Sequence, residues 1–345
     1  VGDVEVDYIK NRYEEFKELY PYLEFYDKAE LAKIEPKIIL NSDGTHRAEN
    51  VVGMGVKSGE YTTVDYGAFT TTFIENAKKD KSECDVYLNS RVDEIYRNGD
   101  KFYIQTANGL SISADFVVVN AGAHSLYLAH KMGYGLDFGC LPVAGSFYLT
   151  KQKLLNGKVY MVQNPKLPFA ALHGDPDILA DGCTRFGPTA LALPKLERYH
   201  ENWGSFLDFC KTLNFDTAIA GILFDLFKDS EIRNYILRNF LFEVPYLNKK
   251  LFVKDARKIV PSLTTNDIYY AKGFGGVRPQ VLNKTEKKLM LGEASINPKT
   301  GIIFNMTPSP GATSCLGNAL RDVREVCEYL GRNFNEAKLN EELFD

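Results

Sequence analysis

The chain has 345 residues, enough for two domains that each bury a full core. Its hydrophobic, charged and aromatic fractions of 45%, 25% and 12% are ordinary for a globular protein and exclude a disordered or fibrous chain. A formal net charge of −4, without any long basic run, gives no reason to expect nucleic acid as a partner. No stretch of sequence has the apolar length that a membrane-spanning helix needs.

The cysteine and histidine residues show no spacing that indicates a metal site. His124 and His130 are not four residues apart on one helical face, and no carboxylate accompanies them. The six cysteines are scattered without any C-x-x-C pair, which is typical of a reducing cytoplasm and argues against a disulfide framework. We therefore expect a cytoplasmic protein without a metal centre.

The N-terminal region alternates short helices with turns. Apolar residues at helical spacing predict a helix over residues 4–20, and Asp27 is placed to cap a short second helix. Residues 41–45 (NSDGT) form a turn signal that is followed directly by His46 and Arg47. These two side chains either face a substrate or belong to a polar loop, and both readings stay open.

A β-meander is the clearest local prediction, because hydrophobic alternation and Asn-Gly turns coincide. It follows a predicted helix over residues 66–77. Turns at residues 98–100 and 108–109 separate its strands. The predicted strands cover residues 86–88, 91–96, 101–106 and 110–113.

An apolar, β-branched run over residues 116–120 ends in Asn-Ala-Gly and leads into a predicted helix over residues 123–132. This pattern is typical of a buried parallel strand whose carboxyl end opens on a ligand-binding crevice. We therefore expect residues 120–122 to lie beside a ligand.

Long β segments replace the strand–helix pattern near residue 140, which predicts a domain boundary there. The strands of this antiparallel sheet are expected at residues 140–149, 158–162, 169–172 and 183–186. His173 follows one of them, with Asp175 and Asp177 close by in sequence. A carboxylate can fix the imidazole tautomer and raise its basicity, so His173 is either a catalytic base or a structural histidine.

Residues 195–262 are expected to form an inserted helical subdomain that serves as a lid or a partner-facing surface. Its helices are predicted at residues 196–213, 216–227, 230–242 and 253–259. The apolar segment over residues 218–227 is either buried in a helical core or lies on a membrane surface, and we favour burial.

The C-terminal region contains a glycine-rich turn with Arg278 just after it. Strands are predicted at residues 268–272, 287–291 and 302–304, and the acidic tail over residues 333–345 is expected to be frayed. Residues 304–319 are expected to form a short strand, a tight turn and an amphipathic helix with Ser309 at its N-cap and Pro310 at its first position. Small side chains in that first turn would let a flat or anionic ligand approach the backbone N–H groups, although an ordinary capped helix has the same pattern.

Three stretches together, residues 114–125, 273–280 and 304–319, resemble the D-amino-acid-oxidase-like flavoprotein superfamily. Within it, the closest resemblance is to the malate:quinone oxidoreductase family, and it extends from about residue 5 to residue 330. The phrases that carry it are RFGPTA at residues 185–190, GVRPQ at 276–280 and SPGATS at 309–314.

The resemblance implies an α/β (α+β) fold, with an FAD/NAD(P)-binding-type sheet domain and an antiparallel-sheet substrate domain that carries a helical insertion. The substrate domain is expected at residues 1–63 and 133–285, with the insertion at about 195–262, and the partial FAD-binding domain at residues 64–132 and 286–335. The chain lacks the family's G-x-G-x-x-G turn, which holds the flavin pyrophosphate. We therefore expect that roughly a hundred residues of the usual enzyme, its first βαβ unit, are absent from this sequence.

The resemblance also implies FAD as the cofactor, with (S)-malate oxidised to oxaloacetate and electrons passed to a membrane quinone. Arg278 would clamp a substrate carboxylate, with Gln280 and His46 as further substrate contacts and His173 as the base. Localisation is expected at the inner face of the cell membrane, as a peripheral protein. The cofactor contacts implied are Val92, Ala121, Gly122, Gly311, Ala312, Thr313 and Ser314.

Two alternatives stay open. One is another flavin-linked 2-hydroxy-acid dehydrogenase, such as one acting on L-2-hydroxyglutarate, because the sequence does not reveal which residues line a second carboxylate pocket. The other is a non-catalytic fragment that binds no flavin, which the missing glycine fingerprint favours. The sequence makes no prediction of the oligomeric state.

Overall fold

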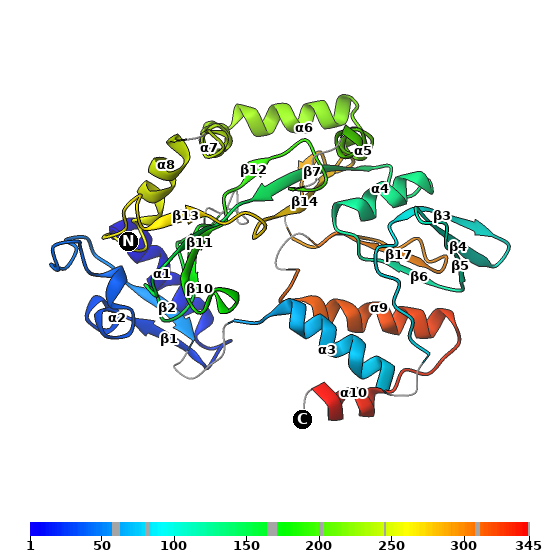
Figure 1. Ribbon diagram of the computed structural model, residues 1–345, viewed down its shortest axis with the longest axis horizontal. Helices are drawn as coiled ribbons and strands as arrows, with labels where there is room; N and C mark the ends of the chain where they lie inside the picture. Colours follow the sequence, from blue (N-terminus) through cyan, green and yellow to red (C-terminus); the bar gives the residue numbers. More distant parts are fainter. Residues whose placement is uncertain are drawn as a thin grey trace. The chain divides into compact units, whose positions relative to one another are not determined.

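The computed structural model of the protein describes residues 1–56, 63–79, 83–163, 171–199, 203–244, 246–290, 292–307 and 311–343 (Figure 1). The chain divides into two compact units, and each unit consists of three separate segments. The first unit contains Val1–Asp80, Ala144–Leu191 and Asp229–Gly276, and the second contains Lys81–Val143, Ala192–Lys228 and Val277–Asp345. Whether these units correspond to a substrate domain and an FAD-binding domain stays a prediction.

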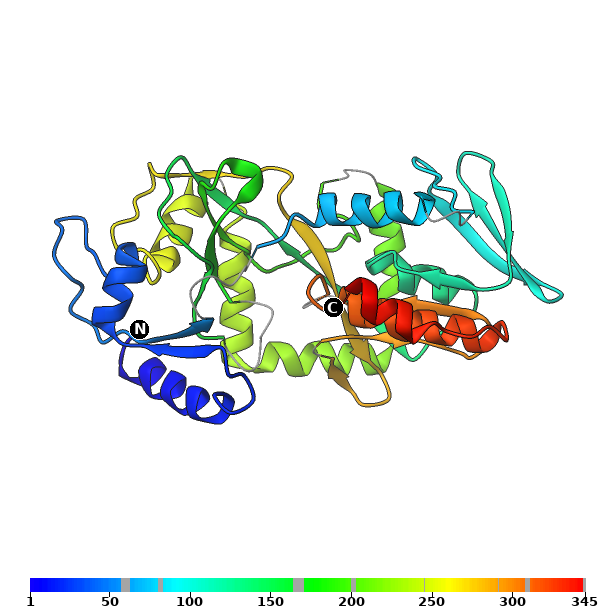
Figure 2. The same ribbon diagram turned by 90° about the horizontal axis from the view of Figure 1, so that it is seen from below.

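The N-terminal part of the first unit has the predicted short helices. Helix α1 (Asp3–Phe16) lies against the antiparallel ribbon of β1 (Leu23–Tyr26) and β2 (Gly53–Val56), as Figure 2 shows. Asp27 caps α2 (Lys28–Ile34) in a reciprocal capping box with Glu30, which confirms the predicted cap. The 3-10 helix η1 (Pro36–Ile38) follows, and α3 (Tyr66–Lys79) confirms the helix predicted at residues 66–77.

A buried carboxylate joins the N-terminal segment to the middle of the chain. Glu35 accepts hydrogen bonds from the backbone N–H groups of Asn156, at 3.0 Å, and Gly157, at 2.6 Å. Burial raises the pKa of the Glu35 carboxyl, although these two hydrogen bonds favour its ionised form. The contact links positions about 120 residues apart in the sequence, and therefore fixes the first unit across two of its segments.

A five-stranded antiparallel sheet forms the centre of the first unit, in the order β13-β8-β11-β10-β9. One face of it packs on helices α7 (Ser230–Leu241) and α8 (Leu247–Ala256) through a core that includes Tyr148, Phe186 and Phe252. The 3-10 helix η3 (Ile178–Ala180) connects two of the strands. The strands are β8 (Tyr148–Thr150), β9 (Val159–Tyr160), β10 (His173–Pro176), β11 (Thr184–Gly187) and β13 (Ile268–Tyr270).

The second unit contains the predicted meander of β3 (Val92–Asn98), β4 (Lys101–Thr106) and β5 (Ser111–Ala114). Gly99 and Gly109 have φ values of 62° and 88°, which explains why glycine is needed in both turns. The strand predicted at residues 86–88 is wrong, because these residues are exposed and form no ladder in the structure. Exposed apolar alternation without a partner strand does not form a sheet.

A three-stranded sheet in the order β16-β17-β6 carries the one parallel pair among the described strands of the second unit. Its strands are β16 (Ser295–Ile296), β17 (Ile302–Asn305) and β6 (Val117–Val119), and helices α4 (Ala123–Lys131) and α9 (Cys315–Tyr329) follow β6 and β17 in the chain. The tail predicted to be frayed instead forms α10 (Glu336–Leu343). Asn335 accepts a hydrogen bond from the Lys338 N–H and Arg324 pairs with Glu336, which stabilises this helix start.

A four-stranded sheet, β12-β7-β14-β15, completes the architecture. Its strands are β7 (Phe138–Gly145), β12 (Leu191–Ala192), β14 (Gly276–Asn283) and β15 (Lys288–Leu289). The single strand predicted at residues 140–149 is wrong, because Ser146 turns out of the ladder and its N–H donates to Thr189 Oγ1 at 3.0 Å. The chain therefore continues as β8 in a different sheet.

The helical region differs from the prediction at its start and in its grouping. Helix α5 (Trp203–Leu213) begins later than residue 196, because the buried Leu196 lies in a bend and its N–H donates to Ser205 Oγ at 3.2 Å. Helices α5 and α6 (Thr217–Lys228) belong to the second unit, whereas α7 and α8 belong to the first. In the part of the chain that is described, no helix is long and apolar enough to cross a membrane.

Candidate functional site

Strands β6 and β17 are parallel neighbours, so the turns that follow them lie at the same edge of the sheet in the second unit. Val117 pairs with Ile302 and Val119 with Phe304, so the carboxyl ends of both strands reach the same level. Residues 120–122 follow β6, and residues 306–307 follow β17. Crevices beyond the carboxyl ends of parallel strands are the usual ligand sites of such sheets.

The turn after β6 is fixed in place and open on one side. The Ala121 N–H donates to Ser125 Oγ at 2.8 Å, and that hydroxyl donates to the Val119 carbonyl oxygen at 3.2 Å. Gly122 has φ 57° and ψ −126°, and no atom lies within 4 Å of the position that a Cβ would take. A side chain is therefore disfavoured by the backbone conformation while the space beside it is empty, as close approach of a flat ligand requires.

The turn before α9 differs from the prediction. The predicted N-cap at Ser309 and first position at Pro310 lie outside the described residues. Residues 311–314 form a turn, and the helix begins at Cys315 with Ser314 as N-cap residue. Ser314 Oγ donates to the Gly311 carbonyl oxygen at 3.5 Å and makes no cap bond, while a Cβ on Gly311 would lie 2.7 Å from the Thr307 carbonyl oxygen. This close backbone approach bends the chain before the helix begins.

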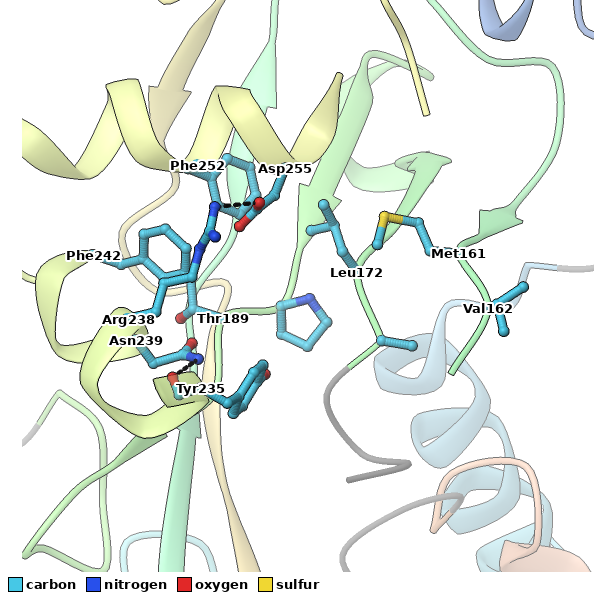
Figure 3. Close-up of a pocket in the computed structure, with 12 residues that line it drawn as sticks. Met161, Val162, Leu172, Thr189, Tyr235, Arg238, Asn239, Phe242, Phe252 and Asp255 are labelled. Atoms are coloured by element: carbon cyan, nitrogen blue, oxygen red, sulfur yellow. Dashed lines mark hydrogen bonds and ion pairs between the residues drawn. The ribbon is translucent and has the colours of Figure 1, made fainter. Parts of the chain in front are cut away.

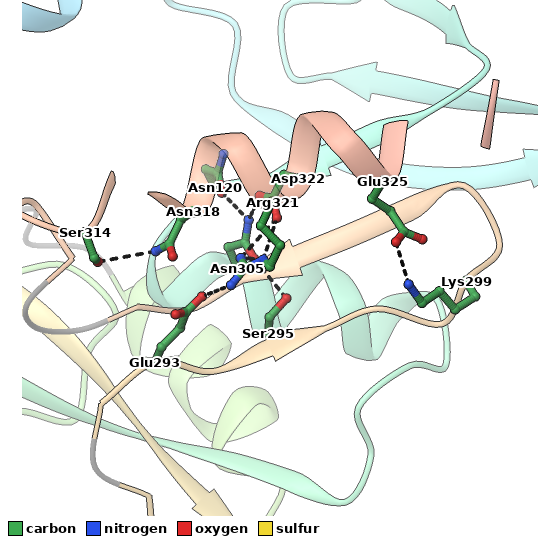
Figure 4. Close-up of polar contacts among 10 residues, drawn as sticks. All are labelled: Asn120, Glu293, Ser295, Lys299, Asn305, Ser314, Asn318, Arg321, Asp322 and Glu325. Atoms are coloured by element: carbon green, nitrogen blue, oxygen red, sulfur yellow. Dashed lines mark hydrogen bonds and ion pairs between the residues drawn. The ribbon is translucent and has the colours of Figure 1, made fainter. Parts of the chain in front are cut away.

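A buried polar network fixes α9 on β17 beside this edge (Figure 4). The Asn305 amide N donates to Asn120 Oδ1 at 2.9 Å and to Asp322 Oδ2 at 2.5 Å, and its carbonyl oxygen accepts from Ser295 at 2.9 Å. Arg321 pairs with Asp322 and with Glu293. The network sets the position of the turn ends relative to both helix and sheet, and the sequence analysis did not identify it.

Val92 lies at the start of β3 in the same unit. It is half-buried and pairs with Thr106, and a β-bulge follows it between Val92 and Glu94. A bulge interrupts the regular ladder and leaves a residue unpaired there. The predicted adenine contact of Val92 through its backbone stays a prediction.

Arg278 and Gln280 are two residues apart on β14, so their side chains lie on the same face of that strand. Gln280 is only 1% exposed, and neither its amide N nor its amide O has a hydrogen-bond partner among the described residues. The buried Thr307 Oγ1 also has none within the described part of the chain. Buried polar atoms are nearly always hydrogen-bonded, so the Gln280 amide has the capacity to bind a further polar group.

His173 lies in a buried charged cluster on the first unit's central sheet. His173 and Asp175 share one face of β10, with 3.6 Å between Nε2 and Oδ1. Arg185 stands opposite Asp175 on β11 and pairs with Asp175 at 2.8 Å and with Asp177 at 2.9 Å. Only Asp175 and Asp177 are nearly inaccessible, at 2% and 3% exposure. The cluster therefore contains two buried carboxylates, one arginine and one imidazole.

Burial and a neighbouring cation act in opposite directions on the Asp175 carboxylate. Burial raises the pKa of the Asp175 carboxyl, and the positive charge of Arg185 opposes that rise. Aromatic rings enclose the site: the Tyr160 ring lies 4.6 Å and the Phe147 ring 6.0 Å from the imidazole, centroid to centroid. The Arg185 guanidinium also stacks on Phe147, 4.8 Å from the ring centroid. The imidazole and the Asp175 carboxylate therefore lie side by side in surroundings that are largely closed to water.

His46 has a different setting from His173, although both belong to the first unit. It is exposed and forms an isolated bridge with Leu40, at the end of the loop that the sequence predicted. The neighbouring Arg47 is buried instead, and it donates to the Ile38 and Lys258 carbonyl oxygens. Arg47 is therefore structural, and substrate contact by His46 stays a prediction.

The fit of a flavin can be judged from these residues alone. The open Gly122 turn, the turn over residues 311–314 and the buried Thr307 hydroxyl form a glycine-lined edge with hydrogen-bonding capacity, which suits an isoalloxazine ring. The glycine fingerprint that cradles a pyrophosphate is not among the 345 residues. The chain therefore fits the ring side of FAD.

Comparison with a solved structure defines the class of fold. The dithionite-reduced L-alpha-glycerophosphate oxidase from Mycoplasma pneumoniae, with FAD bound, superposes with a TM-score of 0.60 at 18% sequence identity. The match covers 95% of this chain and 71% of that one. The fold is thus that of the FAD-dependent oxidases, and it confirms the predicted mixture of helices with antiparallel sheets.

The family follows from sequence comparison. The profile of the malate:quinone oxidoreductase (Mqo) family matches residues 1–341. A probable malate:quinone oxidoreductase of Campylobacter jejuni is 62% identical over 345 residues, which are 99% of this chain and 77% of that protein. A malate:quinone oxidoreductase of Helicobacter pylori is 49% identical over 345 residues, which are 99% of this chain and 76% of that protein. The chain belongs to the malate:quinone oxidoreductase family of oxidoreductase enzymes, which confirms the resemblance inferred from its motifs.

Proposed function

We propose that the protein oxidises (S)-malate to oxaloacetate and passes the electrons to a membrane quinone. The observation that carries the proposal is the buried His173–Asp175 pair, within a chain that matches the family along its length. Oxidation of a 2-hydroxy acid removes the hydroxyl proton to a base and the C2 hydrogen as a hydride. FAD, when bound, supplies the acceptor for that hydride.

In this proposal His173 takes the hydroxyl proton, and the Asp175 carboxylate stabilises the imidazolium that results. Aromatic rings around His173 exclude water, which strengthens the interaction between the two charges. The Arg185 guanidinium keeps the Asp175 carboxylate ionised and oriented. His173 is thus the catalytic residue, and Asp175 and Arg185 position it.

Arg278 is proposed to hold a malate carboxylate in a bidentate pair, because its planar guanidinium matches the two carboxylate oxygens. The buried amide of Gln280 would add a hydrogen bond from the same face of β14. At the ring edge, residues Ala121, Gly122 and 311–314 would hold the flavin. The N-terminal end of α9 would favour negative charge there.

The acceptor in this proposal is lipid-soluble, so we expect the protein to work as a peripheral protein at the inner face of the cell membrane. This expectation follows from the proposed use of a membrane quinone. Among the described residues, no helix is long and apolar enough to span a membrane. Sedimentation of the protein with lipid vesicles is the direct measurement.

The test compares single variants of the flavin-loaded enzyme. Arg278→Ala is expected to raise the KM for malate with little change in kcat, and His173→Asn to lower kcat by about 10²–10⁴-fold. His124→Asn is the control, since His124 is a half-buried histidine that belongs to the second unit, whereas His173 belongs to the first. His46→Ala tests the predicted substrate contact by its effect on the KM for malate. Equal small effects of the His173 and His124 changes would refute the assignment of the base.

A further inference from the structure

A cavity of about 250 Å³ lies in the first unit, on the helix-covered side of the central sheet (Figure 3). Helices α7 and α8 contribute Arg238, Phe242 and Phe252, and the strand side contributes Met161 and Leu172. Figure 3 shows the two sets facing each other across the space. The cavity is therefore bounded by two elements of secondary structure that the core holds in fixed positions.

The apolar wall presents aromatic rings. Phe242 and Phe252 are in edge-to-face contact, with 6.0 Å between ring centroids, and Tyr148 stacks behind Phe252 at 4.2 Å. Packing on both sides fixes the Phe252 ring, so this wall is rigid. A preformed wall of aromatic and aliphatic side chains favours a flat apolar ring over a flexible polar ligand.

The polar end of the cavity holds one cation and one anion. Arg238 Nη2 pairs with the Asp255 carboxylate, and the two charges balance. Arg238 Nε is buried and has no hydrogen-bond partner among the described residues. Because the guanidinium charge is already neutralised, the site does not favour an anion, yet it still offers one buried N–H donor. A neutral ligand with a carbonyl oxygen meets both conditions.

This cavity and the His173 cluster lie on opposite faces of β10. Side chains alternate along a strand, so Gly174 faces away from the side of His173 and Asp175. A Cβ on Gly174 would lie 2.7 Å from the Phe186 ring, and Leu172, next to β10, belongs to the same core cluster as Phe186. A hydroxy acid that reaches His173 therefore lies outside the cavity.

We propose that the cavity binds the ring of the quinone, which takes up two electrons from the reduced flavin of the loaded enzyme and two protons from solvent to become a quinol. The flat ring occupies the apolar part of the cavity, and one quinone carbonyl oxygen accepts a hydrogen bond from Arg238 Nε. The volume of about 250 Å³ is below the roughly 300 Å³ typical of pockets for drug-sized ligands, so the cavity has room for the ring and the lipid tail extends outside. This inference rests on the proposed function, because the relatives' quinone is taken as the acceptor of this protein.

The experiment uses the flavin-loaded enzyme and menadione, a naphthoquinone without a lipid tail. Leu172→Trp fills the cavity, and Leu179→Trp is the matched control because Leu179 is 70% exposed on η3. Titration calorimetry measures menadione binding, and stopped-flow absorbance measures reduction of the flavin by malate. We expect Leu172→Trp to weaken menadione binding and raise its KM by about tenfold or more, with flavin reduction and the control unchanged.

A conservative second variant keeps the test decisive if Leu172→Trp does not fold. Arg238→Lys retains the pair with Asp255 but removes the Nε–H, so menadione binding should weaken by about three- to tenfold, the loss of one hydrogen bond. Thermal unfolding of each variant separates a binding defect from a folding defect.

The outcomes separate the two proposals. If malate does not reduce the flavin of the parent enzyme, the proposed function fails, and menadione binding still tests the cavity. Unchanged menadione affinity in a folded Leu172→Trp or Arg238→Lys variant overturns the quinone site while leaving malate oxidation intact. Loss of flavin reduction by malate, with menadione binding retained, would assign the cavity to the hydroxy acid and also overturn the proposal.

Discussion

Replacing Arg185 with methionine would test the charged cluster on the central sheet. The change keeps an apolar side chain of similar length and leaves Asp175 and Asp177 as buried carboxylates without their guanidinium partner. Removing one partner of a buried ion pair costs about 3–5 kcal/mol. Arg185 keeps 24% of its side chain exposed, so water screens part of that cost and we expect about 3 kcal/mol at neutral pH.

The loss should depend on pH with a defined sign. The pKa of Asp175 is raised in the folded protein by burial, and loss of the arginine raises it further. A raised folded pKa means that stability is highest when the carboxyl is protonated and falls as pH rises through that pKa. The deficit of Arg185→Met should therefore shrink as the pH is lowered from 7.5 to 5, because a carboxyl with a raised pKa takes up a proton more readily on acidification.

Urea unfolding followed by circular dichroism at pH 7.5 and pH 5 measures both quantities. Arg91→Met is the matched control, because Arg91 pairs with Asp93 at 2.9 Å but is 76% exposed. The control should cost no more than about 1 kcal/mol. Adding Asp175→Asn to Arg185→Met should restore part of the stability. Similar losses for Arg185→Met and Arg91→Met, or a deficit that grows on acidification, would refute the reasoning.

Three further predictions concern packing and ionisation. Glu35→Gln removes a buried acid whose pKa burial raises, so the Tm difference in favour of the variant should grow from pH 4 to pH 7; a constant difference would contradict this. Thiol labelling should modify the exposed Cys210 before unfolding and Cys140 only after it, because burial raises the pKa of Cys140 to about 12. Gly139→Ala places a Cβ 2.5 Å from a backbone carbonyl oxygen and should lower the free energy of unfolding by about 1–3 kcal/mol. Gly221→Ala, on the open face of α6, should raise it by about 0.5–1 kcal/mol. Urea unfolding measures both changes.

Local sequence patterns predicted the elements whose causes are local. The Asn-Gly turns fixed the hairpins of the meander, and the Asp27 capping box fixed the start of α2, because both signals act within four residues. The β-branched run before residues 120–122 predicted a parallel strand, and β6 pairs with β17 in parallel as expected. The sequence predicted that Asp175 and Asp177 lie close to His173, and in the structure His173 and Asp175 share one face of β10.

Long-range partners could not be read from the sequence. Arg185 meets Asp175 only because of the register of β10 and β11, and the Asn305 network depends on a contact between residues 185 positions apart. Helix α9 begins later than the predicted N-cap because the backbone at Gly311 approaches Thr307, which no residue pattern announces. Arg185 follows Asp175 and Asp177 after a short connection in the sequence. Two strands joined by so short a connection commonly pair, and this could have indicated that Arg185 lies opposite the aspartates.

The division of the chain into interleaved segments has a consequence for how the protein can be cut and how it unfolds. The polypeptide passes from one compact unit to the other at residues 80/81, 143/144, 191/192, 228/229 and 276/277. A single protease cleavage at any of these points leaves both units assembled from non-contiguous pieces, so nicked protein should stay associated rather than release a stable half. No truncation at one end yields either unit by itself. Each unit is therefore complete only after most of the chain has been synthesised.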